Sequence, residues 1–83
     1  MLKEAILKNA PAIGSTDGTP EGKRRVVFTA THHSGWEWTA YEAERTEMDD
    51  VLCFGRVEGF ESELGYFTVD ELLENRVDIK VSA

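Results

Sequence analysis

The sequence predicts a single α+β domain in which an antiparallel sheet of three to five strands packs against a short N-terminal helix and a capped C-terminal helix. Three observations favour this class. The chain has 83 residues, which is enough for one domain with one small core. Its middle part is rich in β-branched and aromatic residues that alternate as strands do. A segment near each end instead has apolar residues at helical spacing.

The first expected element is a helix over residues 2–9. Leu2 and Ile6 lie one helical turn apart, and Pro11 ends the pattern because proline disfavours helical geometry in the residue before it. Residues 10–22 concentrate Gly, Ser, Thr, Asp and Pro without apolar periodicity, which is typical of a mobile loop.

The sheet is expected within residues 23–67, and it begins with a hairpin. The run 23–31 is rich in β-branched residues and predicts the first strand. The turn sequence His32–Gly35 follows. The next strand places Trp36 and Trp38 on one face, because side chains two residues apart in a strand point the same way.

The second half of the sheet is less regular in sequence. Residues 42–50 are acidic and lack a clean apolar period, so they are expected to form a loop. Residues 51–57 are apolar on both faces, which is typical of a central strand. A turn is expected over 59–65, followed by a brief extended piece at 66–67.

A capping box marks the last helix, expected over residues 69–75. The Thr68 hydroxyl and the Glu71 carboxylate are spaced to accept hydrogen bonds from free backbone N–H groups at a helix start. The two leucines Leu72-Leu73 are expected to face the sheet. Residues 77–81 alternate and are expected to form a final edge strand or a tail.

Charge and composition exclude several classes of function. The net charge is −7, so a phosphate backbone would repel the chain, and direct binding of nucleic acid is disfavoured. A single cysteine cannot form an internal disulfide, and no secretory signal or apolar run of roughly 20 residues is present. The expected location is the cytoplasm, with no membrane role.

The acidity belongs to the C-terminal two thirds of the chain. Residues 1–31 contain five Lys or Arg and three Asp or Glu, a balance of +2, whereas residues 32–83 contain four and thirteen, a balance of −9. Such a face either only keeps the protein soluble or docks a basic partner, since clustered charge of one sign speeds encounter with the other.

No catalytic, cofactor or metal site is expected. The pair His32-His33 and Cys53 do not have the spacing of zinc ligands, and Cys53 falls in an apolar strand. Glu61 and Glu63 are two residues apart, but an acid–base pair needs a cleft that a small domain does not readily provide. The protein is therefore expected not to be an enzyme.

The remaining kind of function is binding of a partner through carboxylates. Residues two apart on a strand are separated by about 6.6–6.8 Å, similar to successive phosphates of a nucleic acid strand. The candidate partner-binding residues are Glu42, Glu44, Glu47, Asp49, Asp50, Glu61, Glu63, Asp70 and Glu74. The candidate aromatic anchors beside them are Trp36, Trp38, Tyr41, Phe60 and Tyr66.

The pattern Trp36-x-Trp38 followed by FGxVxGFExELGYFTxxEL from Phe54 resembles a small family of uncharacterised bacterial proteins, a domain of unknown function. The resemblance covers roughly residues 24–73. It implies an α+β fold and carriage by plasmids, integrated elements and phages, and it brings no assigned activity. More loosely, the size and charge are similar to those of acidic phage anti-CRISPR inhibitors.

These observations lead to two hypotheses about function. The first is a non-enzymatic acidic interaction module from a mobile element, an anti-CRISPR-like inhibitor that blocks nucleic-acid binding. Its partner would be a basic nucleic-acid-binding protein or ribonucleoprotein complex of the bacterial host. The alternative is an accessory domain that binds a peptide or small ligand in an aromatic groove near Trp36, Trp38 and Tyr66. The sequence leaves the oligomeric state open.

Overall fold

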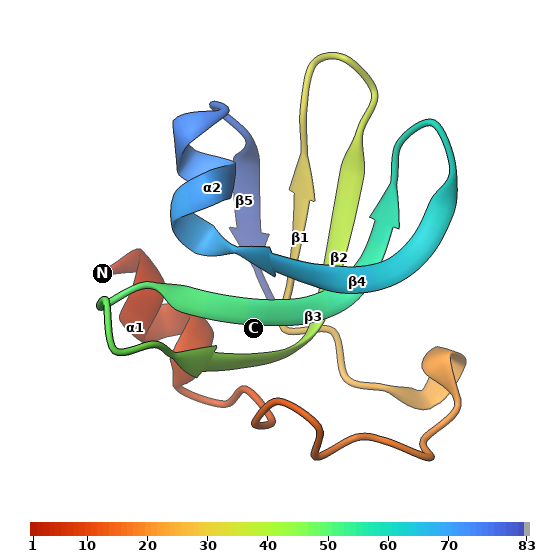
Figure 1. Ribbon diagram of the computed structural model, residues 1–83, viewed down its shortest axis with the longest axis vertical. Coiled ribbons are helices and arrows are strands. Elements are labelled where there is room, and N and C mark those ends of the chain that lie inside the picture. The colour runs from red at the N-terminus through yellow and green to blue at the C-terminus, as the bar shows by residue number, and fades with distance from the viewer. Residues whose placement is uncertain (83) are drawn as a thin grey trace.

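Five antiparallel strands form one curved sheet in the computed structural model, which describes residues 1–82 (Figure 1). Their spatial order is β4-β3-β2-β1-β5, so β4 and β5 are the edges. The strands are β1 (Phe28–Thr31), β2 (Glu37–Arg45), β3 (Val51–Glu58), β4 (Ser62–Thr68) and β5 (Asp78–Val81). The predicted α+β class is confirmed, with five strands in the sheet.

Two short helices cover one face of this sheet. Helix α1 spans Leu2–Leu7 and helix α2 spans Val69–Glu74. Ile6 of α1 and Leu72 of α2 belong to one buried cluster with sheet residues such as Cys53. We call this side of the sheet the helix face and the opposite side the loop face. In residues 1–82, no helix has the length and hydrophobicity needed to cross a membrane.

The first strand is shorter than predicted. A 3₁₀ turn, η1, spans Glu21–Lys23, and β1 begins only at Phe28. The 3₁₀ turn forms because Pro20 presets the backbone and its carbonyl accepts a hydrogen bond from the Lys23 N–H at 2.9 Å. The predicted hairpin between the first two strands and the predicted edge strand near the C-terminus are confirmed, since β1 pairs antiparallel with both β2 and β5.

The prediction of a loop over residues 42–50 was wrong for its first half. Strand β2 continues to Arg45 through a β-bulge, where Tyr41 is the extra residue between the pairs Ala40–Gly55 and Glu42–Phe54. The bulge breaks the two-residue alternation of side chains, so the sequence pattern did not indicate a strand beyond it. What remains of the predicted loop is a tight turn between β2 and β3.

The predicted turn over residues 59–65 was also too long. Strand β4 already begins at Ser62, and the chain reverses over three residues, with the Gly59 N–H donating to the Glu61 carbonyl at 3.0 Å. Gly65 and the charged Glu63 weaken the strand signal in sequence. They are nevertheless paired with Gly55 and Val57 of β3.

Helix α2 begins at the predicted capping box. The Glu71 N–H donates to the Thr68 hydroxyl at 3.2 Å, and the Thr68 N–H donates to the Glu71 carboxylate at 3.3 Å. Leu72 is 2% exposed and docks the helix on the sheet. The same expectation for Leu73 was wrong, because its side chain is 47% exposed.

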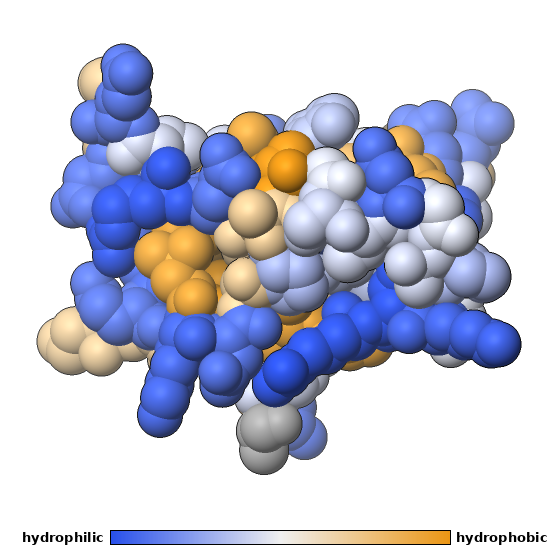
Figure 2. All heavy atoms as spheres, turned by 90° about the horizontal axis from the view of Figure 1, so that it is seen from below, coloured by the Kyte–Doolittle hydropathy of each residue, from blue (hydrophilic) through white to orange (hydrophobic). Residues whose placement is uncertain are grey.

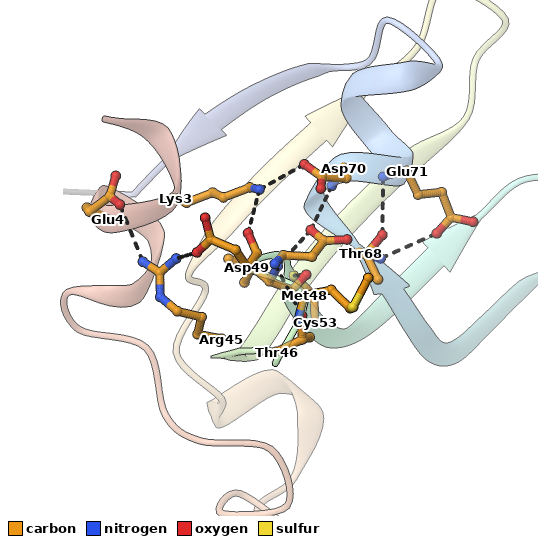
Figure 3. Close-up of polar contacts among 12 residues, drawn as sticks. Lys3, Glu4, Arg45, Thr46, Met48, Asp49, Cys53, Thr68, Asp70 and Glu71 are labelled. Carbon is orange, nitrogen blue, oxygen red and sulfur yellow. Dashed lines mark hydrogen bonds and ion pairs between the residues drawn. The ribbon is translucent and has the colours of Figure 1, made fainter.

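Polar contacts connect both helices to the turn between β2 and β3 (Figure 3). Arg45 forms ion pairs with Glu4 of α1, at 3.3 Å, and with Asp49 of the turn. Lys3 lies between the Asp49 carbonyl, at 2.8 Å, and the Asp70 carboxylate of α2, at 2.9 Å. These contacts place the two helices side by side over the turn.

Residues 10–24 form a loop segment that lies along β2 and on the loop face, at the bottom of Figure 1. The Ala43 N–H donates to the Pro11 carbonyl at 3.0 Å, and Glu42 accepts the Gly14 N–H at 2.7 Å. From below, hydrophobic atoms show only in separate patches among hydrophilic ones (Figure 2). The segment predicted to be mobile is thus hydrogen-bonded to the sheet.

Candidate functional site

A groove of about 500 Å³ lies on the helix face, bounded by α2, β4 and the turn between β1 and β2. Four aromatic residues and two carboxylates contribute to its lining, together with small and apolar groups. The lining residues are His32, Ser34, Trp36, Trp38, Val57, Glu63, Gly65, Tyr66, Phe67, Glu71, Leu72 and Asn75. We call this feature the aromatic groove.

The strand register places the floor of the aromatic groove. Trp38 of β2 lies opposite Val57 of β3, which in turn lies opposite Glu63 of β4. Cross-strand partners share a face of the sheet, so these three side chains form one row on the helix face. Gly65 lies two residues after Glu63 and leaves open space beside the row, since no heavy atom lies within 4 Å of where its Cβ would be.

Trp36 forms the outer wall, just before β2 begins. Its ring packs on Gly59, where a Cβ would come within 2.5 Å of ring atoms. The ring also meets Phe60 edge to face at 5.7 Å and lies 6.1 Å from the Trp38 ring, centroid to centroid. Phe60 itself is 96% exposed, so the aromatic wall extends to the tip of the turn between β3 and β4.

Acidic side chains border the aromatic groove. Glu63 and Glu71 line it, and exposed Glu61 and Glu74 lie close in sequence to lining residues. The ion pairs within residues 1–82 include none of Glu61, Glu63 and Glu74. These three carboxylates are therefore free to attract a cation.

The acidic residues predicted for β2 have structural roles instead. Glu42 is 1% exposed, and its carboxylate accepts the N–H groups of Gly14 and Thr16 and the Thr16 hydroxyl. Burial raises the pKa of Glu42, but these hydrogen bonds outweigh that effect and hold the pKa below its ordinary value. Exposed Glu44 accepts the Ile13 N–H at 3.0 Å. An exposed carboxylate row at Glu42 and Glu44 is thus not formed.

The acidic residues of the turn between β2 and β3 lie at the opposite end of the sheet from the groove. Asp50 accepts the N–H groups of Val51, at 2.7 Å, and Asp70, at 3.0 Å. Burial raises the pKa of Asp50, but those hydrogen bonds outweigh that effect and hold the pKa below its ordinary value. Asp49 and Asp70 are ion-paired, and Glu47 is exposed. The predicted carboxylate surface is therefore split between two ends of the molecule.

The predicted aromatic anchors also divide. Trp36, Trp38 and Phe60 gather at the aromatic groove. The Tyr66 ring packs on Phe54 at 5.0 Å on the loop face, although Tyr66 also contributes to the groove lining. Tyr41 lies away from the groove and donates its hydroxyl to Glu21 at 2.7 Å.

Groups for chemistry other than binding are scarce in the part of the chain that the structure describes. Burial raises the pKa of the Cys53 thiol to about 12, so it stays protonated and unreactive at neutral pH. Residues 1–82 contain no group of three or more His, Cys, Asp or Glu placed to hold a metal ion. The arrangement at the groove suits a flat or cationic group held between aromatic rings and carboxylates.

The sequence predicted Trp36, Trp38, Glu63 and Tyr66 of the groove lining, but sequence reasoning missed Val57 and Gly65. These two residues reach the groove through the pairing of β3 with β4, and the sequence pattern did not reveal most of β4. Comparison with protein-family models, curated proteins and solved structures finds no match to this chain. The family resemblance over residues 24–73 stays a prediction.

Proposed function

We propose that this protein is an interaction module that binds a basic segment of a partner protein, with a Lys or Arg side chain held in the aromatic groove. One observation carries the proposal: Trp36, Trp38, Glu63 and Glu71 line the same groove. Aromatic faces attract cations, and carboxylates neutralise them, so the two groups together favour a cationic side chain.

The energetics favour the groove over the exposed carboxylates alone. An exposed ion pair contributes about 0–1 kcal/mol, because water screens it and side-chain entropy is lost. A cation over an indole contributes about 0.5–2 kcal/mol, and more as water is excluded. Burying aromatic surface adds to this, so the Trp side chains are expected to dominate the affinity.

The natural fluorescence of the protein tests this proposal directly, because its two tryptophans both line the groove. A peptide rich in Lys and Arg should change the emission in a saturable way, and a peptide with Gln at those positions should not. Glu63→Gln should weaken binding about 2–5-fold, as expected for loss of one charge contact. Trp38→Phe should weaken it further because the larger indole face is lost.

Glu47→Gln is the matched control, since Glu47 is an exposed carboxylate at the other end of the sheet. Binding by this variant should equal that of the wild type. The proposal would be wrong if all three variants bound the basic peptide alike, or if the Gln peptide bound as well as the basic one. Affinity should also fall as salt rises, because exposed charges are screened within roughly 8 Å at 0.15 M.

A second candidate is the nucleic-acid mimic expected from the sequence, now with different residues. Glu37 of β2 and Glu58 of β3 lie directly opposite each other on the loop face, and both are exposed. Like charges in this position destabilise a sheet, so the pair has a cost that a basic partner would relieve. Binding of a basic partner that is lost in Glu37→Lys and Glu58→Lys but kept in Trp38→Phe would favour this candidate over the groove.

A further inference from the structure

Strand β4 is an open edge of the sheet. Within residues 1–82 it pairs only with β3, so its other side presents backbone N–H and C=O groups without strand partners. Edge strands are commonly protected by charged residues, and β5 has two, Asp78 and Lys80, among its four residues. Strand β4 has seven residues and one charge, Glu63. It is the less protected edge.

The two sides of β4 offer different chemistry. The side chains of Glu63 and Phe67 point to the helix face, where Gly65 lies between them, and all three residues line the aromatic groove. Leu64 and Tyr66 alternate with them, point to the loop face and are 40% and 63% exposed. A strand added beside β4 would therefore meet acidic and aromatic groups on one face and exposed apolar groups on the other.

We infer that β4 pairs with an extended segment of the partner, which adds a sixth strand and alternates apolar and basic residues. This inference rests on the proposed function of the groove. Neighbouring strands lie about 4.8 Å apart, and a Lys or Arg side chain is longer than that. A side chain opposite Gly65 can pass over the open space at this glycine and enter the groove. Its neighbours face Leu64 and Tyr66, where apolar side chains fit.

Charge selects a basic segment over a second copy of this chain. The one charged side chain in β4 is negative, Glu61 and Glu71 lie near it, and the whole chain has a net charge of −7. A second copy would bring the same carboxylates to the edge, whereas a basic strand neutralises them. Main-chain hydrogen bonds would supply affinity, and the groove would supply specificity.

Two N-methylated peptides test strand addition separately from groove binding. The parent peptide has seven residues that alternate Leu with Lys or Arg. In an added strand, every second N–H faces β4, so methylating one alternate set of backbone nitrogens should weaken binding at least about tenfold. Methylating the other set should change binding less than about twofold. Hydrogen exchange should show new protection in β4 and none in β5.

The other outcomes distinguish failure of strand addition from failure of the proposed function. If both methylated peptides bind like the parent while Trp38→Phe weakens binding, strand addition is overturned and the groove proposal stands. If Trp38→Phe and Glu63→Gln bind the parent peptide as well as the wild type does, the proposed function is overturned. If sedimentation shows a dimer that protects β4 from exchange and that the peptide does not dissociate, the occupant of this edge is a second copy, and the inference is overturned.

Discussion

Gly55 and Gly65 lie opposite each other on β3 and β4, yet they differ in their tolerance of a side chain. A Cβ on Gly55 would lie 1.9 Å from the Thr39 carbonyl oxygen, whereas a Cβ on Gly65 would have no heavy atom within 4 Å. The first glycine permits the close approach of backbone beside the bulge. The second leaves room in the aromatic groove.

This contrast gives a prediction that separates folding from binding. Gly55→Ala should destabilise the protein by about 1–3 kcal/mol, because backbone atoms must shift to admit the methyl group. Gly65→Ala should be neutral or stabilising by up to about 1 kcal/mol, since glycine is unfavourable inside a strand. Denaturant unfolding measures both changes.

Gly65→Val extends the same prediction to function. The branched side chain should fill the open space beside Trp38, and affinity for the basic peptide should fall although the domain stays folded. Unchanged affinity in this variant would show that the space over Gly65 is not used by the ligand.

At the scale of elements, α2 is held by one leucine rather than two. Leu72 is 2% exposed and Leu73 is 47% exposed. Leu72→Ala should cost about 2–5 kcal/mol by leaving a cavity, whereas Leu73→Ala should cost less than about 1 kcal/mol. Thr68→Ala should cost about 1 kcal/mol through loss of the cap. Thermal or denaturant unfolding that gives equal losses for the two leucines would contradict this assignment.

The elements also show which sequence signals were sufficient to predict a helix or a strand. The capping box at Thr68 and the apolar run in β3 act locally, so both were predicted from sequence. The continuation of β2 past Tyr41 depends on a bulge, and burial of Glu42 depends on donors 26 and 28 residues earlier in the chain. Strand β4 contains a glycine and a charge, and its pairing with β3 outweighs its weak propensity.

The candidate site was predictable only in part, for the same reason. Trp36 and Trp38 stood out as a pair with one shared face, and both line the groove. The acidic residues, by contrast, look alike in sequence, and nothing in the local sequence distinguished buried Glu42 from exposed Glu63. Tertiary pairing decides which of them face solvent beside the aromatic wall.

At the scale of the whole molecule, a cluster of charged and aromatic side chains on the loop face attaches residues 10–24 to the sheet. Arg56 donates from Nε to Glu21 at 3.0 Å and pairs with it through a second nitrogen, and Tyr41 donates to the same carboxylate. The Arg24 guanidinium lies 5.9 Å from the Tyr41 ring centroid and 5.7 Å from that of Phe54. Acidic and basic residues far apart in sequence are thereby neutralised together.

This cluster predicts how stability depends on pH. Hydrogen bonds from Arg56 and Tyr41 lower the pKa of Glu21 from 4.5 to about 2. A carboxylate whose pKa is lower in the folded state contributes stability above its unfolded pKa, and this contribution is lost as pH falls through the folded pKa. Burial and the hydrogen bond to Glu21 raise the pKa of Tyr41 from 10.0 to about 12, so its contribution is lost as pH rises over that range.

Glu21→Gln should therefore be less stable than the wild type by about 1 kcal/mol at neutral pH, and the difference should shrink as pH falls from 4.5 to about 2. Denaturant midpoints measured across this range for both proteins test the prediction, because carboxylates common to both cancel in the difference. Glu47→Gln, which changes an exposed carboxylate in the turn between β2 and β3, should follow the wild type throughout. A difference between wild type and Glu21→Gln that is constant from neutral pH to about 2 would mean that the charge of Glu21 does not hold residues 10–24 on the sheet.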